Sequence, residues 1–422
     1  MRYRSPRGTQ DILPELQPYW HHIVQSAENI ATKYNYKKID TPMFEDTDLF
    51  LRGVGEGTDI VEKEMYTFLD RGGDSLTLRP EGTASICRAY IEHGMHTLPQ
   101  PVRLYYIAPA FRYERPQRGR FRQHHQFGLE AIGDGSPIID AEIIELAYQY
   151  LYSAGISKMQ FMINNIGDKS CRPMFVNALV EFYKKRLDDI CEDCRLRFSK
   201  NPLRLLDCKR TDYLCQQMIG DSPHTVDYLC TECDEHWNRL LSYLDSLNIN
   251  YIINPRLVRG LDYYTKTVFE VHPQESGSQT ALLGGGRYDG LMEELGSKPV
   301  PGIGFGSGIE RIVGELRTNK NFVIKELIPD AIMIHIGSPA SLEVIKIASS
   351  LRNEGMNIVI APDGRSLRGQ MRYAESMKAS YVIIIGQNEI DSGLAQVKNM
   401  SNGTQKSCPI NELSPDSFSN ID

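Results

Sequence analysis

The spacing of apolar and polar positions predicts a chain that mixes helices with strands. Apolar residues recur at helical intervals over about residues 16–34 and 139–151. Nearly continuous or alternating apolar residues instead predict strands at 102–108 and from residue 265 onward. A further strand is expected over 38–44. Because Pro42 cannot donate a hydrogen bond to a neighbouring strand, this one should lie at an edge or an interface.

The pattern changes after a linker near residues 320–329. Strands and helices then alternate, which predicts a small α/β domain with a mostly parallel sheet. Arg365, Arg368 and Arg372 share one face of a predicted helix, and that face is either a solvated surface or a contact with nucleic acid. The polar tail from Ser401 has little pattern, so we expect it to be loose at its end. The expected segments are strands at 331–336, 357–360 and 381–385 and helices at 340–353 and 367–376.

Residues 171–247 look like a separate helical insertion, and cysteines are concentrated there. The chain has nine cysteines, an odd number, which favours reduced thiols over a disulfide scaffold. Four thiolates from two CxxC pairs are able to enclose a tetrahedral zinc ion. Buried cysteine is also a common small core residue, so the sequence leaves both interpretations open. The two pairs are Cys191 with Cys194 and Cys230 with Cys233, with Cys208, Cys215 and His236 nearby.

Charge and composition narrow the class of protein without deciding its partner. The chain has 422 residues, enough for about two or three domains. Its formal charge of −7 gives no overall attraction to nucleic acid, so any such binding must come from local basic patches. Residues 1–10 lack the apolar segment of a signal peptide and no long apolar run follows, so we expect a cytoplasmic protein without a membrane span.

The stretch 111–130 (FRYERPQRGRFRQHHQFGLE) carries five arginines against two glutamates. Pro116 and Gly119 interrupt it, so it reads as a strand, an exposed loop and a second strand. A guanidinium group holds two phosphate oxygens in one plane and stays charged near neutral pH, which suits a polyphosphate or a nucleic-acid backbone. A solvated basic hairpin is the alternative. Gln126 and Glu130, polar residues on the apolar second strand, favour a ligand site.

A strand-to-helix junction is predicted at residues 76–83 (LTLRPEGT), which lead into a helix over 84–92. Glu81 and Thr83 would face outward there, where they can meet the ammonium group of a ligand. A helix cap explains the same residues, with Thr83 as the cap and Glu81 favoured by the helix dipole. From these residues alone the cap is the preferred explanation.

Three further stretches suggest a ligand site. Residues 256–270 (RLVRGLDYYTKTVFE) predict a turn that presents Arg259, followed by a strand. Tyr263 and Tyr264 lie beside the turn, although tyrosines on a strand are usually packing residues. Residues 282–290 (LLGGGRYDG) predict a glycine turn at which the backbone can approach a ligand closely. Residues 301–311 (PGIGFGSGIER) predict a strand that leads into a helix near Arg311. A positive charge near a helix start works against the helix dipole, which suggests an anion nearby.

Read together, these stretches resemble the histidyl-tRNA synthetases, which are class II aminoacyl-tRNA synthetases, over nearly the whole chain. Residues 41–46 (TPMFED) are similar to the dimer-forming motif 1, residues 111–130 to motif 2 and residues 302–311 (GIGFGSGIER) to motif 3. Two stretches typical of the histidine-specific family narrow the resemblance further, 257–265 (LVRGLDYYT) and 284–289 (GGGRYD).

The resemblance implies an α+β fold in three parts. A catalytic domain at residues 1–328 would hold a six-stranded antiparallel sheet flanked by helices, with the helical insertion at about 171–247. An α/β anticodon-binding domain would follow at 329–422. The implied reaction is ATP-dependent ligation of L-histidine to tRNA(His) through a histidyl-adenylate, with Mg²⁺ and a homodimer. Negative charge builds up on phosphorus in the first step and the histidine carboxylate needs no base, so fixed cations should do most of the catalysis.

The resemblance also implies roles for individual residues. Arg112 and Arg259 would be the catalytic residues that hold the α-phosphate, and Arg311 would hold the distal phosphates and the adenine side. Gln117 and Arg118, at the tip of the motif 2 loop, would contact the acceptor end of the tRNA. The implied histidine-binding residues are Glu81, Thr83, Arg112, Gln126, Glu130, Arg259, Tyr263 and Tyr264, and the implied ATP-binding residues are Arg112, Glu114, Arg120, His124 and Arg311.

One residue departs from the family pattern. Two other hypotheses about function also compete with the synthetase interpretation. His124 stands where the family commonly has a phenylalanine that stacks on adenine, and a flat imidazole can also stack. The synthetase-like regulatory subunit of ATP phosphoribosyltransferase shares the catalytic fold, but the intact RGLDYYT stretch around Arg259 and the extra domain from Asp330 favour the enzyme. A zinc-stabilised RNA-binding protein without catalysis would leave Glu81, Glu130 and Tyr264 unexplained.

Overall fold

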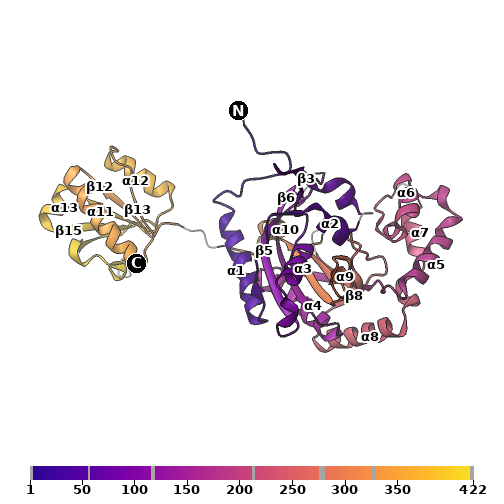
Figure 1. The fold of residues 1–422 in the computed structure, drawn as a ribbon. Coiled ribbons are helices and arrows are strands. Elements are labelled where there is room, and N and C mark those ends of the chain that lie inside the picture. Colours follow the sequence, from indigo (N-terminus) through magenta and orange to yellow (C-terminus); the bar gives the residue numbers. More distant parts are fainter. Residues whose placement is uncertain are drawn as a thin grey trace. The chain divides into compact units, whose positions relative to one another are not determined.

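The computed structural model describes residues 3–55, 58–115, 119–211, 214–274, 281–324 and 328–418. The chain forms two compact units, Met1–Val323 and Ile324–Asp422 (Figure 1). Within the described ranges, no helix is both long enough and apolar enough to cross a membrane.

The first unit is built on an eight-stranded sheet. Its six inner strands are antiparallel to their neighbours, which confirms the antiparallel catalytic sheet, and one short strand pairs in parallel with each edge of this set. In spatial order the strands are β1 (Lys37–Lys38), β5 (Val102–Phe111), β6 (Gln123–Ile132), β11 (Gly302–Gly308), β10 (Leu283–Arg287), β9 (Thr265–Pro273), β7 (Met159–Asn165) and β8 (Tyr251–Ile253).

Helices cover both faces of this sheet (Figure 1). Side chains alternate along β6, so Phe127 and Leu129 enter the larger core while Gln126 and Glu130 point to the opposite face. That opposite face carries the ligand-site candidates. The larger core is covered by α1 (Gln17–Lys33), α4 (Pro137–Ser153), α8 (Thr231–Ser246) and α10 (Ile309–Thr318), and the opposite face by α3 (Thr83–Glu92) and α9 (Leu291–Glu294).

A second, three-stranded sheet corrects one expectation about residues 38–44. The expected single strand is divided: β1 belongs to the large sheet, whereas β2 (Phe44–Asp46) pairs with β4 in the small sheet. Pro42 lies between them and has no N–H to continue a ladder, so the chain changes sheets there. The small sheet has the order β2, β4 (Ser75–Leu78) and β3 (Tyr66–Leu69), and α2 (Thr47–Val54) follows β2.

The cysteine-rich insertion is helical, as its pattern predicted. It has its own small core, and the described residues between 172 and 246 contain no strand. The helices are α5 (Arg172–Lys184), α6 (Glu192–Lys200), the 3₁₀ segment η4 (Pro202–Asp207), α7 (Cys215–Asp221) and α8, which returns to the main core.

The second unit is a five-stranded sheet with helices. Three strands are parallel and the last two antiparallel, so the expected parallel arrangement holds for part of the sheet only. The tail after Ser401 showed little pattern, yet residues 405–409 form an edge strand, and the end of the tail, which we expected to be loose, lies outside the described residues from residue 419. The sequence did not predict this strand, because only Cys408 of its residues is buried and the segment therefore has no apolar alternation. The strands are β13 (Ile358–Ile360), β12 (Ala331–His335), β14 (Tyr381–Ile385), β15 (Leu394–Asn399) and β16 (Gln405–Pro409), and the helices α11 (Ser338–Asn353), α12 (Leu367–Ser376) and α13 (Gln387–Ser392).

Candidate active site

A cavity of about 170 Å³ lies on the face of the large sheet that carries Gln126. The strands β6, β9, β10 and β11 and the start of α3 all contribute to its wall. Gln117 and Arg118 lie outside the described residues, so their predicted contact with tRNA stays a prediction. The predicted site residues that line the cavity are Glu81, Thr83, Arg112, Glu114, Arg120, His124, Gln126, Arg259, Tyr263, Tyr264 and Arg311.

The start of α3 combines the two explanations that the sequence left for Glu81 and Thr83. The Glu81 carboxylate accepts hydrogen bonds from the backbone N–H groups of Thr83, at 2.7 Å, and Ala84, at 2.8 Å. Glu81 is therefore the capping side chain, and Thr83 is the first helical residue rather than the cap. Burial raises the pKa of Glu81 above its ordinary value. Both side chains also line the cavity, so one helix end serves structure and site together.

Glu130 lies one layer behind the cavity wall. Its carboxylate accepts hydrogen bonds from the hydroxyls of Thr83, at 2.8 Å, and Tyr288, at 2.6 Å. On the neighbouring strand, Gly304 leaves room for it, because a Cβ at that position would lie 1.9 Å from Glu130 Oε2. Burial raises the pKa of Glu130 to about 8. A direct contact between this carboxyl group and a ligand stays a prediction.

Arg259 is held by an anionic partner that sequence reasoning missed. Its guanidinium group forms an ion pair with Glu270 and lies 5.6 Å from the centre of the Tyr264 ring. Burial works against both charges, but their mutual attraction outweighs it, which raises the pKa of Arg259 and lowers that of Glu270. Arg259 Nε is buried and has no hydrogen-bond partner within the described part of the chain. The cavity therefore contains a fixed cation with an unused donor.

The glycine stretch at 282–290 forms strand β10 rather than the expected turn. Its predicted close approach nevertheless occurs, because a Cβ on Gly284 would lie 2.5 Å from Arg259 Nη1. Gly284 is also the cross-strand partner of Glu270. The register of β9 and β10 thus sets the carboxylate opposite the glycine, and the loop before β9 brings Arg259 into the space that the glycine leaves.

The arginine hairpin supplies a second cationic group. Arg112 Nε donates to the Pro80 carbonyl at 2.8 Å, and the Glu114 carboxylate lies between Arg112, at 4.0 Å, and Arg120, at 3.3 Å. Burial, together with repulsion from Arg112 and Arg311, lowers the pKa of His124 to about 3. The imidazole of His124 is therefore neutral near pH 7, as a stacking surface for an aromatic base should be.

The start of α10 closes the other side of the cavity. Arg311 donates from Nε to the Gly119 carbonyl at 3.1 Å and from Nη1 to the Ala281 carbonyl at 2.6 Å. Burial and the nearby Arg120 lower the pKa of Arg311. The sequence gave no indication of the role of its neighbour Glu310. The Glu310 carboxylate accepts a hydrogen bond from the backbone N–H of His125 at 3.0 Å and so joins α10 to β6.

Comparisons with known proteins agree with this geometry. Residues 8–168 and 224–312 match the model of the histidyl-tRNA synthetase family, and residues 331–415 match that of an anticodon binding domain. A histidine–tRNA ligase of Dehalococcoides mccartyi is 50% identical over 411 residues, which are 97% of this chain and 98% of that protein. One from Caldanaerobacter subterraneus subsp. tengcongensis is 46% identical over 413 residues, 98% of this chain and 99% of that protein. The crystal structure of apo S. aureus histidyl-tRNA synthetase is 37% identical, with a TM-score of 0.81, and covers 97% of this chain and 98% of that one.

Proposed function

Because the chain belongs to the histidyl-tRNA synthetase family, we propose that its cavity activates L-histidine with ATP and that the histidyl group then passes to tRNA(His). The observation that carries this proposal is the pair Arg112 and Arg259, two held guanidinium groups on the wall of one cavity. The regulatory-subunit alternative is not favoured, because an anticodon binding domain matches residues 331–415.

Arg112 and Arg259 hold the α-phosphate while the histidine carboxylate attacks it. The transition state carries more negative charge on the phosphoryl oxygens than the ground state does, so cations that are already in place stabilise it selectively. Arg259 is held by Glu270, and Arg112 by the Pro80 carbonyl, so neither needs to reorganise during the reaction. The unused Nε donor of Arg259 is available to a phosphate or carboxylate oxygen.

The end of the cavity next to α3 selects histidine. Glu81, Thr83 and Gln126 surround the α-amino group, and Tyr264 and Glu130 bracket the ring nitrogens with Tyr263 alongside. The buried Tyr263 hydroxyl donates to the Glu81 carboxylate at 3.4 Å, so this end of the cavity is polar and already ordered, and an amino acid without polar groups to match it would bind poorly. Such penalties can reach about 10⁴-fold, which is enough to select histidine without an editing step.

ATP occupies the side between the arginine hairpin and α10. The neutral ring of His124 stacks on adenine, and Arg311, Arg120 and Glu114 complete the nucleotide site. Glu114 and Glu270 are the cavity carboxylates that would hold Mg²⁺ accompanying ATP, because hard cations prefer carboxylate oxygens. When bound, the ion would neutralise charge on the departing pyrophosphate.

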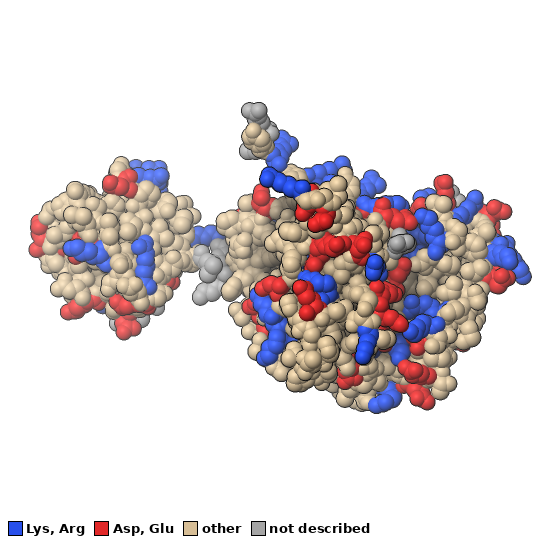
Figure 2. Space-filling model, in the orientation of Figure 1, with Lys and Arg blue, Asp and Glu red and all other residues tan. Residues whose placement is uncertain are grey.

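The chain acts as a cytoplasmic homodimer. The small sheet exposes apolar side chains, with Phe44 50% and Leu69 70% accessible, and an apolar surface of this kind suits burial against a second copy. On the face shown in Figure 2, basic and acidic side chains are interspersed over the first unit, so tRNA must be held through local contacts. The two units correspond to a catalytic domain, 1–328, and an anticodon-binding domain, 329–422, whose exposed residues Arg365, Arg368 and Arg372 are candidate RNA contacts.

Exchange of labelled pyrophosphate into ATP tests the first step without tRNA. Histidine should support the exchange and the other amino acids should not, because only histidine fits the cavity and presents its carboxylate to the arginines. Charging of tRNA(His) then tests the second step. A folded protein that binds histidine but shows no exchange would contradict the proposed function.

A further inference from the structure

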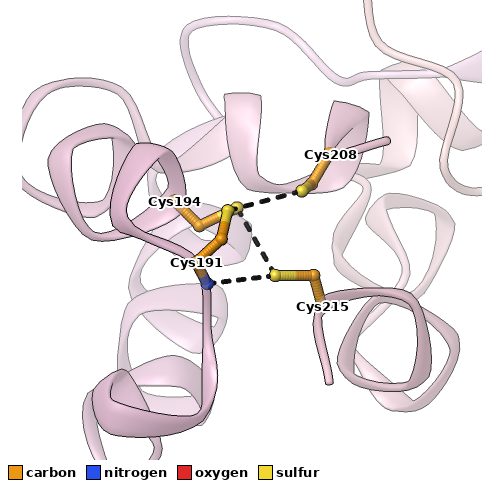
Figure 3. Close-up of side chains that lie close together, drawn as sticks. All are labelled: Cys191, Cys194, Cys208 and Cys215. Carbon is orange, nitrogen blue, oxygen red and sulfur yellow. Dashed lines mark hydrogen bonds between the residues drawn. The ribbon is translucent and has the colours of Figure 1, made fainter. Parts of the chain in front are cut away.

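Four cysteines of the insertion converge on one point. Cys191 precedes α6 and Cys194 lies in its first turn, while Cys208 follows η4 and Cys215 begins α7. Their side chains point toward one another (Figure 3), and all four sulfur atoms lie within 4.8 Å of each other. None of the cysteines in this group, the four-cysteine cluster, lines the candidate active site, and each is at most 7% exposed.

The sulfur positions fit a metal rather than a disulfide. The Cys191 and Cys208 sulfur atoms are 3.8 Å apart, and those of Cys194 and Cys215 are 3.9 Å apart. A disulfide requires a separation of about 2.05 Å. Zinc–sulfur bonds of about 2.3 Å instead place the sulfur atoms of a tetrahedron about 3.8 Å apart. The backbone N–H of Cys191 also donates to Cys215 Sγ at 3.3 Å, a contact that favours a thiolate.

Simple core packing does not explain this arrangement. Cysteines that serve only as small apolar residues have no reason to direct their sulfur atoms to a common point from three chain segments. The buried core of the insertion has twelve residues, and four of them are these cysteines. Its helices are short and its described residues form no sheet, so a structural ion would supply the stability that such a small core lacks.

A second group of potential metal ligands lies at the base of the insertion and shares no residue with the first. Asp168, Cys171, Cys230 and Cys233 lie within 4.8 Å of one another, and the Cys171 and Cys233 sulfur atoms are 3.8 Å apart. Cys230 precedes α8 and Cys233 lies in its first turn, which is the arrangement that Cys191 and Cys194 show at α6. The sequence suggested that the two CxxC pairs together form one zinc site. Instead, each pair combines with ligand candidates from elsewhere in the chain, which makes two separate sites.

We propose that the insertion binds two structural zinc ions, one at the four-cysteine cluster and one at the base site formed by Cys171, Cys230, Cys233 and Asp168. Thiolate-rich tetrahedral sites select zinc over hard cations. The family model omits residues 169–223, which supply all four ligands of the first cluster, whereas of the base site it omits Cys171 and matches the segments that hold Asp168, Cys230 and Cys233. The first ion therefore belongs to the inserted segment, and the base site joins that segment to the matched one.

The first ion would fix a segment that contacts the active-site region. Between Cys194 and Cys208, Asn201 donates to the Asp262 carboxylate at 3.0 Å, and Arg204 forms an ion pair with Asp59 at 2.8 Å. Asp262 belongs to the stretch that presents Arg259. A larger cavity of about 770 Å³ between the insertion and the active site is lined by both Cys208 and Arg259. The metal therefore holds one wall of the approach to the catalytic arginine.

Metal content of the purified full chain tests both sites. Elemental analysis after gel filtration in metal-free buffer should give two zinc ions per chain, with one remaining in Cys208→Ser and one in Cys233→Ser. Cys408→Ser makes the same change at a buried cysteine of the second unit and should keep both. Exchange of zinc for Co²⁺ should produce the strong visible absorption of tetrahedral cobalt thiolates. A single ion that is lost only in Cys208→Ser would overturn the base site, and no ion would overturn both.

A measurement on the unmodified chain keeps the proposal testable if the serine variants do not fold. Under reducing conditions, alkylation mapped by mass spectrometry should spare the seven ligand cysteines while zinc is bound. A strong chelator should make these seven reactive within minutes, while the reactivity of Cys87 and Cys408 stays unchanged. Alkylation of the seven at the same rate with and without chelator would contradict metal binding.

Discussion

The active-site cavity and the insertion hold buried polar groups in opposite ways. In the cavity the protein provides both partners: Arg259 pairs with Glu270, and below the sheet Arg287 pairs with Asp140 at 2.7 Å. Glu270 and Arg287 are placed by strands β9 and β10, Asp140 by helix α4, and Arg259 by the loop that leads into β9. The described residues of the insertion form no sheet, and its cysteine sulfur atoms face mainly one another. The difference teaches that the cavity is organised before a ligand arrives, whereas the proposed zinc ions would organise the insertion.

The largest expected effect on activity comes from removing the Arg259 guanidinium group from the cavity. Arg259→His should lower histidine-dependent pyrophosphate exchange by about 10²–10³-fold, because a fixed donor to the transition state is lost. Calorimetry should show histidine binding within a few-fold of the original chain, since the α3 end of the cavity is untouched. Arg256→His, on the same loop but exposed, is the matched control and should retain exchange. Full turnover in Arg259→His would refute the role of this arginine.

A smaller effect should follow when the same arginine is displaced without a change of charge. In Gly284→Ala the new methyl group would meet the Arg259 guanidinium at 2.5 Å and push it from its place beside Glu270. Pyrophosphate exchange should fall by about 10–100-fold because the cation is present but misplaced. Gly290→Ala is the control, as no atom lies within 4 Å of a Cβ at that position. Equal loss in the two variants would indicate a general effect of alanine rather than displacement of Arg259.

Chelation should separate the two regions directly. With metal removed, hydrogen exchange in α6 and α7 should accelerate by about 10-fold or more, because their core loses the bonds that tie the segments together. Peptides of β6 and β11 should change by less than about twofold, since the sheet holds its own hydrogen bonds. Added zinc should restore the original rates. Equal acceleration in both regions would contradict the distinction, as would no acceleration in either.

The sequence predicted the cavity better than the insertion for a physical reason. Gln126 and Glu130 are four residues apart on one strand, so the period of two already placed them on one face. The ion pair between Arg259 and Glu270 was missed, because it depends on the register that sets Gly284 opposite Glu270. Strand periodicity carries information about faces, and it carries none about which strands become neighbours.

The cysteines show the same limit more sharply. Spacing correctly drew attention to the two CxxC pairs, but it cannot tell which chain segments meet in space. Cys208 and Cys215 were noted only as nearby residues, and Asp168 was not considered, yet the structure places all three among the ligand candidates. The two CxxC pairs do share one local feature. In each pair the first cysteine immediately precedes a helix and the second lies in the first turn of that helix.

The smallest expected effect is a change in stability with pH that depends on Glu130. It compares two carboxyl groups, Glu130 and Glu270. Unlike Glu270, Glu130 is buried with hydroxyl donors and has no cationic partner among the described residues, and burial raises its pKa from 4.5 to about 8. Below about pH 4.5 the folded and unfolded chains both carry this proton. Between about pH 4.5 and 8 the unfolded chain releases it while the folded chain keeps it, so rising pH favours unfolding.

Glu130→Gln, which keeps the shape of the neutral acid, should remove this loss of stability. The melting temperature of the variant should therefore gain on that of the original chain between pH 5 and pH 8.5, by on the order of 5 °C. Glu354→Gln, at an exposed glutamate, should show no such gain. A difference that stays constant with pH would mean that Glu130 is charged throughout, and the carboxylate would then need a cationic partner like the one that Arg259 provides for Glu270.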